Sequence, residues 1–275
     1  MSEAPFARRL LSVTAVEELG AYRVLRVSDP EEGGRAFIPK PGQFAMLSAA
    51  ERWGAGMEQR PFLARAFSVA RHSQGESHFL LEDVGPGTRR LCALRAGDEL
   101  WALGPLGQGF TAPSPGRRAI LLGGGVGIAP LAILQDSLVG TVTVLLGFRD
   151  RAHAQGAALL DGARVASDDG SVGHHGLVTD LLAAEIERDP EAVVYACGPP
   201  AMLEAVRAIC AESEIPAQLA LEAGMACGFG ACFGCVVPTR GGGYLRVCVD
   251  GPVVDAAELE RVEEPAGGAT IGGVE

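Results

Sequence analysis

The 275-residue sequence predicts a multidomain β and α/β protein built from three consecutive parts. Short apolar or alternating runs, separated by turns rich in Pro and Gly, occupy residues 1–111 and favour an antiparallel β-barrel. Strand and helix patterns alternate over residues 112–215, which indicates a parallel sheet of βαβ units. Glycine and cysteine become frequent over residues 216–275, where we expect a small C-terminal domain.

The individual elements follow from these patterns. In the first part we expect strands at residues 22–27, 44–47, 67–70, 78–84 and 99–103. In the second part we expect strands at residues 119–122, 141–146 and 193–196, and helices at residues 129–138, 178–188 and 201–212. The third part ends in a polar tail without a clear element.

Charge and composition argue against several classes of protein. The chain has 23 basic and 34 acidic residues, and because binding to a phosphate backbone needs clustered cations, we expect no nucleic-acid partner. No run approaches the ~18–20 apolar residues of a membrane span, and the N-terminus lacks the apolar core of a signal peptide. We therefore expect no membrane association and a cytoplasmic location. The seven cysteines cannot all pair within one chain, which disfavours a secreted disulfide framework.

Four of the cysteines have the spacing Cys227-x4-Cys232-x2-Cys235-x12-Cys248. A [2Fe–2S] cluster needs four thiolates on two irons, and the x4/x2 start is the spacing of plant-type ferredoxins. The residues between the first three cysteines are mostly small, so the backbone can wrap closely around a cluster. Zinc sites more often use close cysteine pairs with histidine, and no histidine follows His175. We predict an iron–sulfur site, with a zinc-containing binding module as the alternative of another class.

Two strand-to-helix turns in the second part indicate a Rossmann-like nucleotide domain. The turns consist of Gly123, Gly124, Gly125 and Gly127 after the first strand, and of Cys197, Gly198 and Pro199 after the third. Backbone N–H groups at such turns can face a diphosphate, and two turns at the same sheet edge form a crevice. A purely structural tight turn is the alternative for the glycine run taken alone.

The β part contains a third motif, Arg65-Ala66-Phe67-Ser68, with Gly87 and Thr88 downstream. An arginine can bind a phosphate in a forked geometry, while Ser68, Thr88 and the Gly87 backbone supply further donors. A solvated surface strand is the alternative for this motif when it is taken by itself.

The order of these motifs resembles the ferredoxin–NADP reductase superfamily. The cysteine block, followed by Asp-Gly-Pro at residues 250–252, closely resembles the electron-transfer subunits of class 1B dihydroorotate dehydrogenases. The LGPLGQGF run at residues 103–110 and the Asp-Asp-Gly-Ser run at residues 168–171 are also similar to that family. The resemblance covers nearly the whole chain. It implies an FAD-binding barrel at 1–111, an NAD-binding domain at 112–215 and a [2Fe–2S] domain at 216–275.

The resemblance also implies which residues bind each cofactor. FAD would contact Arg65, Ala66, Phe67, Ser68, Leu80, Leu81, Glu82, Gly87 and Thr88. Among these, Arg65 and Thr88 would meet the flavin diphosphate and Ser68 the isoalloxazine ring. The two strand-to-helix turns would bind NAD⁺, with Cys197 near the nicotinamide. Cys227, Cys232, Cys235 and Cys248 would hold the cluster.

Two positions depart from the pattern of the family. Ala66 stands where the family often has proline, and Glu82 stands where a basic residue is common. The first change removes no ligand, whereas the second leaves only the backbone of Glu82 as an expected FAD contact. Only Arg149 and Arg151 follow the second strand of the α/β part, so we expect NAD in preference to NADP.

The function implied is electron transfer from the flavin of a catalytic partner, through [2Fe–2S] and FAD, to NAD⁺. The partner would be an FMN-containing subunit that oxidises dihydroorotate to orotate in pyrimidine biosynthesis, in a heterotetramer with two copies of each chain. This chain shows no convergent acid–base pair, so we expect no catalytic residue in it for that oxidation. Within the same fold, the alternative is the small subunit of an NADPH:ferredoxin or sulfide oxidoreductase, which is similar in every motif named.

Overall fold

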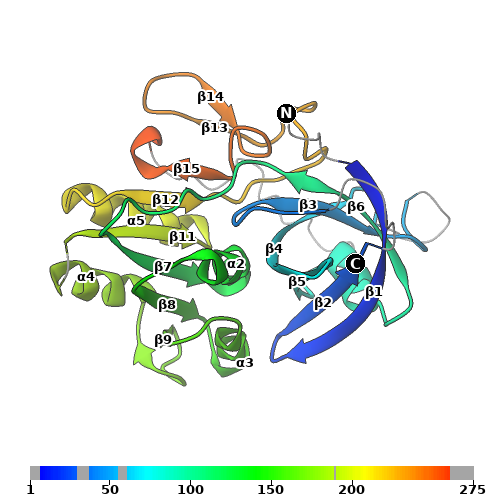
Figure 1. The fold of residues 1–275 in the computed structure, drawn as a ribbon, viewed down its shortest axis with the longest axis horizontal. Coiled ribbons are helices and arrows are strands. Elements are labelled where there is room, and N and C mark those ends of the chain that lie inside the picture. The colour runs from blue at the N-terminus through cyan, green and yellow to red at the C-terminus, as the bar shows by residue number, and fades with distance from the viewer. Residues whose placement is uncertain (1–6, 30–36, 55–60, 189, 261–275) are drawn as a thin grey trace, which may run out of the picture.

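The computed structural model describes residues 7–29, 37–54, 61–188 and 190–260 of the chain. A β-barrel and an α/β unit lie side by side, and the strands of the C-terminal segment lie along the upper edge of the α/β unit (Figure 1). The predicted combination of an antiparallel barrel and a parallel α/β sheet is confirmed.

Six antiparallel strands close into the barrel in the order β1-β2-β5-β4-β3-β6. They are β1 (Ala7–Leu19), β2 (Tyr22–Ser28), β3 (Phe44–Ala49), β4 (Arg65–Ser73), β5 (Glu76–Glu82) and β6 (Glu99–Leu106). Buried and less buried positions alternate along β6, and the inward side chains of the barrel, such as Leu25, Phe79 and Leu100, form its core. A short helix, α1 (Pro86–Cys92), follows β5 and contacts it.

The second unit is a seven-stranded sheet in the order β10-β9-β8-β7-β11-β12-β15, parallel except for β15. Its strands are β7 (Arg118–Gly124), β8 (Val142–Phe148), β9 (Ala163–Ser167), β10 (His174–His175), β11 (Ala192–Cys197), β12 (Ala217–Ala220) and β15 (Val253–Asp255). The central strands are buried on both faces, as a sheet covered by helices on both sides requires.

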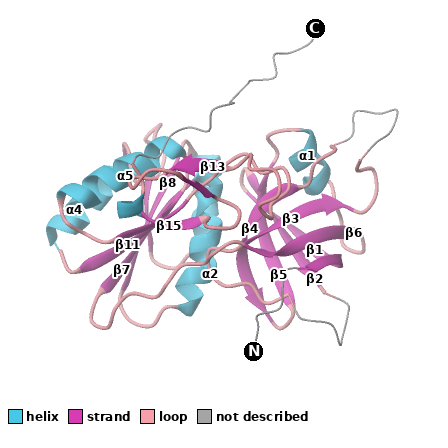
Figure 2. Cartoon of the chain, turned by 90° about the horizontal axis from the view of Figure 1, so that it is seen from above, coloured by secondary structure: helices cyan, strands magenta, loops and turns pink. Residues whose placement is uncertain are grey.

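Helices cover both faces of this sheet. Helix α2 (Ala129–Ser137) lies between the sheet and the barrel, where it contacts β4, whereas α4 (Val178–Arg188) and α5 (Pro200–Glu212) cover the opposite face (Figure 2). The shorter helical segments are η1 (Gly125–Ile128), α3 (Arg151–Ala154), η2 (Gln155–Leu159) and η3 (Ala256–Glu258). The parallel sheet and its helices therefore present the carboxyl ends of β7, β8 and β11 toward the barrel side.

The C-terminal segment is joined to the α/β sheet instead of standing apart from it. Only the hairpin of β13 (Val236–Pro238) and β14 (Tyr244–Arg246) forms a separate sheet. The seven-stranded sheet continues beyond residue 215, where the sequence suggests a boundary, because β12 pairs in parallel with β11 and β15 pairs with β12.

One buried apolar cluster connects all three parts of the chain. It includes Met46 and Leu106 of the barrel, Leu219 of the α/β sheet, and Val247 and Cys248 of the C-terminal segment. Close packing of this kind transmits position from one part to the next. The loop that carries the cysteines is thus held against both the barrel and the sheet.

Candidate functional site

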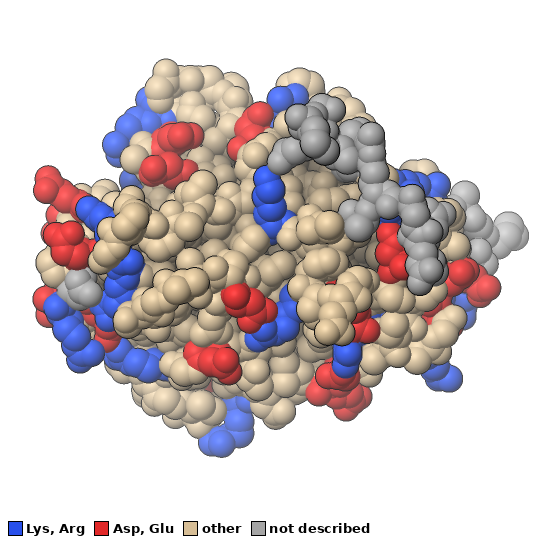
Figure 3. Space-filling view, viewed as in Figure 1, with Lys and Arg blue, Asp and Glu red and all other residues tan. Residues whose placement is uncertain are grey.

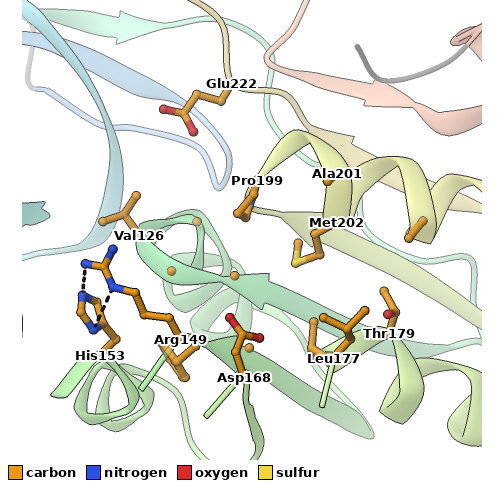
Figure 4. Close-up of a pocket in the computed structure, with 18 of the residues that line it drawn as sticks. Val126, Arg149, His153, Asp168, Leu177, Thr179, Pro199, Ala201, Met202 and Glu222 are labelled. Atoms are coloured by element: carbon orange, nitrogen blue, oxygen red, sulfur yellow. Dashed lines mark hydrogen bonds between the residues drawn. The ribbon is translucent and has the colours of Figure 1, made fainter. Parts of the chain in front are cut away.

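A cleft of about 440 Å³ lies between the barrel and the α/β unit (Figure 4). Tyr22 and Glu82, from β2 and β5, belong to its barrel side. The glycine turn after β7, the residues after β8 and the start of α5 form the other side. Because open α/β sheets bind ligands at the carboxyl ends of their strands, this cleft is the candidate nucleotide site.

The two predicted nucleotide turns contact each other in this cleft. A Cβ atom on Gly127 would lie 2.5 Å from the carbonyl oxygen of Cys197, and one on Gly124 would lie 2.9 Å from Cδ of Pro199. Side chains at either glycine would separate the turns. The predicted turn residues that line the cleft are Gly124, Gly125, Gly127, Gly198 and Pro199.

The other two turn residues, Gly123 and Cys197, are not among the residues that line the cleft. Gly123 is buried at the end of β7, where a Cβ atom would lie 2.9 Å from Cγ2 of Ile128, so its glycine serves the packing of the turn. Burial raises the pKa of the Cys197 thiol, and the nearby Glu222 carboxylate raises it further. Burial also raises the pKa of Glu222, which lines the cleft.

A charged network that the sequence did not predict crosses the seam between the units. Arg149 donates a hydrogen bond to Glu82 Oε1 at 2.5 Å and also contacts His153 (Figure 4). His153 Nε2 lies 3.3 Å from the same Glu82 oxygen, and its Nδ1 lies 2.6 Å from Asp150 Oδ1. The side chain of Glu82 is thus engaged by the α/β unit. The only sequence signal for this network is that Arg149 directly follows a strand.

Asp168 is a further acidic residue at the cleft. It directly follows β9, its backbone N–H donates to the carbonyl of Phe148 at 3.0 Å, and it lines the cleft (Figure 4). A carboxylate at this edge of a nucleotide domain can accept hydrogen bonds from ribose hydroxyls. Of the Asp-Asp-Gly-Ser run noted in the sequence, Asp168 is the residue that lines the cleft, whereas Asp169 accepts a hydrogen bond from the N–H of Ser171.

The structure brings together Arg65 and Gly87, two residues of the predicted FAD motif. A Cβ atom on Gly87 would lie 2.6 Å from Arg65 Nε, so only glycine permits this approach. The guanidinium also donates to the carbonyl of Leu63. Because the first N–H groups of a helix lack intrahelical acceptors, Arg65 and the start of α1 together offer several donors to an anion.

The Thr88 hydroxyl is used within its own loop. It accepts hydrogen bonds from the N–H groups of Val84 at 2.9 Å and Gly85 at 3.0 Å, and it donates to the Gly85 carbonyl at 3.1 Å. Thr88 therefore shapes the start of α1, and its backbone N–H is the group left to face a ligand.

The remaining residues predicted at FAD lie on β4 and β5. Ala66, Phe67 and Ser68 pair with Met46, Ala45 and Phe44 of β3. The side chains of Leu80 and Leu81 are buried in two different apolar cores, so only their backbone groups can contact a ligand.

The four predicted cluster cysteines form two pairs. The Cys227 and Cys232 thiols lie close enough to affect each other's ionisation, as do Cys235 and Cys248, and the N–H of Cys248 donates to Cys235 Sγ at 3.4 Å. Burial opposes ionisation of Cys227, but the backbone N–H groups of Phe229 and Cys232 outweigh it and lower the pKa to about 6. Burial and the neighbouring Cys235 raise the pKa of Cys248 to about 12. Among the residues that the structure describes, no group of three or more His, Cys, Asp or Glu side chains is arranged to hold a single metal ion.

The cysteine loop packs directly on the barrel. A Cβ atom on Gly228 would lie 2.5 Å from Met46 Cγ, and Met46 pairs with Ala66 across the barrel strands. Gly230 is equally close to the C-terminal segment, because a Cβ atom there would lie 2.7 Å from Val249 Cγ2. The small residues between the cysteines therefore allow the loop to lie between the barrel and its own C-terminal end.

The two other motifs of the resemblance also contact each other. The N–H of Gln108, in the 103–110 run, donates to the Gly251 carbonyl at 2.5 Å. The Gln108 side chain donates to the Val249 carbonyl at 3.1 Å, and a Cβ atom on Gly107 would lie 2.5 Å from Pro252 Cδ. Asp250 accepts hydrogen bonds from the N–H and the guanidinium of Arg246, which closes the turn after Cys248.

The distribution of charged and apolar side chains on the surface indicates which kinds of partner it can bind. On the face shown in Figure 3, acidic and basic side chains are interspersed, and basic side chains do not gather over a continuous area. Large apolar side chains are exposed beside the cysteines instead, with Phe233 at 62% and Tyr244 at 75% exposure. Within the described part of the chain, no helix has the length and apolar character needed to cross a membrane.

Comparison with known proteins places these features in a family. The sequence model of the iron–sulfur cluster binding domain of dihydroorotate dehydrogenase B matches residues 222–260. The electron transfer subunit of dihydroorotate dehydrogenase B (NAD(+)) from Bacillus caldolyticus is 40% identical over 235 residues, covering 80% of this chain and 86% of that protein. The corresponding subunit from Desulforamulus reducens is 35% identical over 234 residues, covering 79% and 86%.

Solved structures show the same fold at lower sequence identity. A chain of an NADH-dependent reduced ferredoxin-NADP oxidoreductase superposes with a TM-score of 0.77 at 24% identity, covering 95% of this chain and 92% of that one. The ferredoxin reductase of a carbazole 1,9a-dioxygenase has a TM-score of 0.66 at 23% identity, covering 78% and 68%. These likenesses concern the fold alone.

Proposed function

The chain belongs to the family of electron transfer subunits of dihydroorotate dehydrogenase B, and we propose that it passes electrons from a catalytic partner to NAD⁺. In this proposal the partner oxidises dihydroorotate to orotate, a step of pyrimidine biosynthesis. The observation that carries it is the packing of Gly228 on Met46, because this contact joins the cysteine loop to the strand that pairs with the predicted FAD motif.

We propose that the barrel binds FAD. Arg65 and the backbone N–H groups of Gly87 and Thr88 would hold the diphosphate, and Ser68 would contact the flavin ring. The close approach of Arg65 to Gly87 supports this fit, since any side chain at position 87 would displace the guanidinium. Glu82 would contribute through its backbone only, because its carboxylate is engaged by Arg149 and His153.

The cleft at the carboxyl ends of β7, β8 and β11 is the proposed site for NAD⁺. Its diphosphate would face the backbone N–H groups of two turns, one at residues 124–127 and one at Gly198. Asp168 would accept hydrogen bonds from a ribose, and its negative charge would disfavour the 2′-phosphate of NADP. The protonated Cys197 thiol, behind the turn, would present no charge to the nicotinamide.

Cys227, Cys232, Cys235 and Cys248 are the proposed cluster ligands. A [2Fe–2S] cluster takes two thiolates on each of two irons, and the x4/x2 spacing of Cys227, Cys232 and Cys235 is that of plant-type ferredoxins. When bound, the cluster carries single electrons, and FAD couples such single-electron steps to the two-electron reduction of NAD⁺. The chain's own contribution is to hold the cysteine loop against the barrel through Gly228 and against Val249 and Arg246 through Gly230.

We propose that the catalytic partner contains FMN, that it docks on the apolar surface beside the cysteines, and that the complex contains two copies of each chain. Phe229, Phe233 and Tyr244 are exposed there, and the N–H of Gly234 points at Cys232 Sγ, 3.5 Å away. Because large exposed aromatic side chains commonly mark protein interfaces, this surface is the preferred docking site. A cytoplasmic location also belongs to the proposal: all seven cysteines are free thiols, as is usual in a reducing compartment.

The test is to purify the chain with its candidate partner and to assay reduction of NAD⁺ by dihydroorotate. We expect a coloured complex with flavin and iron–sulfur absorbance that reduces NAD⁺ only when dihydroorotate is present. A colourless, zinc-containing protein would contradict the cofactor assignments. A coloured complex without dihydroorotate-dependent activity would support the cofactor assignments and contradict the assignment to pyrimidine biosynthesis.

A further inference from the structure

The cleft proposed for NAD⁺ has an unusual balance of charge. Among its described lining residues, Glu82, Asp168 and Glu222 are acidic, and Arg149 is the single arginine or lysine. A dinucleotide brings a further doubly charged diphosphate into this space. Turn N–H groups supply partial charges only, so one formal cation must offset three carboxylates and the two charges of the diphosphate. This makes the position of Arg149 decisive for binding.

Arg149 stands at the edge where the diphosphate would enter. Gly147 pairs with Gly124 across the parallel strands β8 and β7, and Arg149 follows two residues beyond Gly147 at the same sheet edge. Figure 4 shows the Arg149 guanidinium on the side of the glycine turn that carries Val126. Its side chain is 61% exposed, so its head can turn within the cleft without unpacking the fold.

In the structure the Arg149 guanidinium is held by the Glu82 carboxylate. The pair spans the seam between the units at 2.5 Å. An exposed arginine–carboxylate pair contributes little net stability, because solvent screens it and both side chains lose freedom. A diphosphate offers the guanidinium a forked, doubly charged partner, which is the stronger interaction.

Tyr22, and His153 when its Nε2 carries the proton, can donate to Glu82 in place of Arg149. His153 Nε2 lies 3.3 Å from the same carboxylate oxygen, and His153 is 9% exposed. Tyr22 pairs with Glu82 across β2 and β5, and its fully buried hydroxyl has no hydrogen-bond partner within the described structure. Burial raises the pKa of Tyr22, with Glu82 raising it further, so the hydroxyl remains a donor at neutral pH.

We propose that Arg149 exchanges the Glu82 carboxylate for the diphosphate of the incoming dinucleotide, and that Glu82 serves as the resting holder of this cation. The proposal rests on the proposed NAD⁺ function of the cleft. It assigns to Arg149 a direct binding role and makes Glu82 the carboxylate that holds Arg149 at rest and competes with the diphosphate for it. It also gives a physical reason for an acidic residue at position 82: the cation comes from the α/β unit, and the barrel supplies its holder.

The test compares NADH dissociation constants of the intact complex carrying Arg149→Gln, Glu82→Gln or the control Arg95→Gln. Arg95 is exposed on the barrel and does not line the cleft, so its variant makes the same charge change elsewhere. We expect Arg149→Gln to weaken NADH about tenfold or more, as loss of a charge-assisted hydrogen bond predicts. Glu82→Gln should bind NADH more tightly than the wild type, because it removes the carboxylate that competes for Arg149, and Arg95→Gln should not change the affinity.

ADP-ribose, which keeps the diphosphate and lacks the nicotinamide, is the second probe. Arg149→Gln should weaken the affinity for ADP-ribose by the same factor as the affinity for NADH. Equal weakening by Arg149→Gln and Glu82→Gln would overturn the proposal, since it would indicate a structural ion pair. So would wild-type affinity in Arg149→Gln, or an unchanged ADP-ribose affinity. If the wild-type complex bound neither probe, the NAD⁺ function itself would fail; flavin content and circular dichroism report folding of each variant.

Discussion

Gly228 lies so close to Met46 that a Cβ atom on Gly228 would come within 2.5 Å of Met46 Cγ. The backbone of Gly228 also has φ of +79°, in the left-handed region that favours glycine. Steric fit and backbone conformation thus select glycine independently at this position. The cysteine loop can approach the barrel because no side chain stands between them.

Replacing Gly228 by valine should therefore push the loop off the barrel. We expect about 1–3 kcal/mol of backbone strain, in addition to the clash with Met46. Iron and sulfide content per chain should fall, and dihydroorotate should reduce the flavin more slowly. Gly224→Ala is the matched control, since a Cβ atom at Gly224 meets nothing within 4 Å. Normal iron content in Gly228→Val would show that the contact does not govern the loop.

The cysteine assignments make a second prediction. Cys232→Ala should abolish cluster assembly, because it removes one of four thiolates and the partner of Cys227. Cys210→Ala is the control: this thiol lies on the buried face of α5, in the apolar core, and burial raises its pKa to about 12. Visible absorbance and electron paramagnetic resonance after reduction measure the cluster. A full cluster signal in Cys232→Ala would show that the ligand set is wrong.

The Arg65–Gly87 contact predicts a selective effect on flavin binding. Arg65→Ala should weaken FAD by about 10- to 100-fold, the range expected for hydrogen bonds to a charged group. The cluster should stay intact, since the cysteine loop contacts other residues of the barrel. Arg89→Ala is the control. It removes an exposed arginine of α1 that pairs with Asp83 at 3.4 Å. Titration of the flavin-free complex with FAD measures both variants, and equal losses would argue against a specific role for Arg65.

Glu76 gives the barrel a dependence on pH. Burial opposes its ionisation, but hydrogen bonds from Thr14, His78 and Arg26 outweigh burial and lower its pKa from 4.5 to about 2. Such a group stabilises the fold above its unfolded pKa, and the contribution is lost as the pH falls from 4.5 toward 2. Because Glu76 is partly exposed, we expect Glu76→Gln to cost about 1–2 kcal/mol at neutral pH.

Urea unfolding at a series of pH values, followed by circular dichroism, measures this difference. The gap in unfolding free energy between wild type and Glu76→Gln should be constant at neutral pH and should shrink below the unfolded pKa. A gap that stays constant down to acid pH would show that the Glu76 network does not depend on its charge.

Strand β1 is an element of the fold that the sequence pattern did not predict. Buried and exposed positions alternate along Glu99–Leu106, and this strand was predicted. Along Ala7–Leu19, by contrast, the register shifts between Val13 and Ala15, which breaks the alternation, and the strand was not predicted. Helix α1 was not predicted either: Pro86 opens it, a position that the fixed φ of proline suits well.

The site could be predicted where its chemistry is local in sequence. The glycine turns and the cysteine block each lie within one short segment, so spacing alone indicates them. The pair of Glu82 and Arg149 joins residues 67 positions apart, and no local pattern connects them. Thr88 is predicted at the flavin diphosphate, and its hydroxyl accepts hydrogen bonds from Val84 and Gly85, which the sequence does not indicate. Competition between a loop and a ligand for one hydroxyl is decided by geometry, which sequence does not contain.

The position of Asp168 predicts the choice between dinucleotides. Its carboxylate lines the cleft directly after β9, where it can accept hydrogen bonds from ribose hydroxyls and repel a 2′-phosphate. Asp168→Ser should therefore weaken NADH and strengthen NADPH, with a combined change in preference of about tenfold or more. Asp169→Asn is the control, because Asp169 accepts the Ser171 N–H at 2.9 Å and does not line the cleft. Dissociation constants for both dinucleotides give the preference directly. An unchanged preference in Asp168→Ser would place the ribose elsewhere in the cleft, since a carboxylate that contacts it could not be removed without effect.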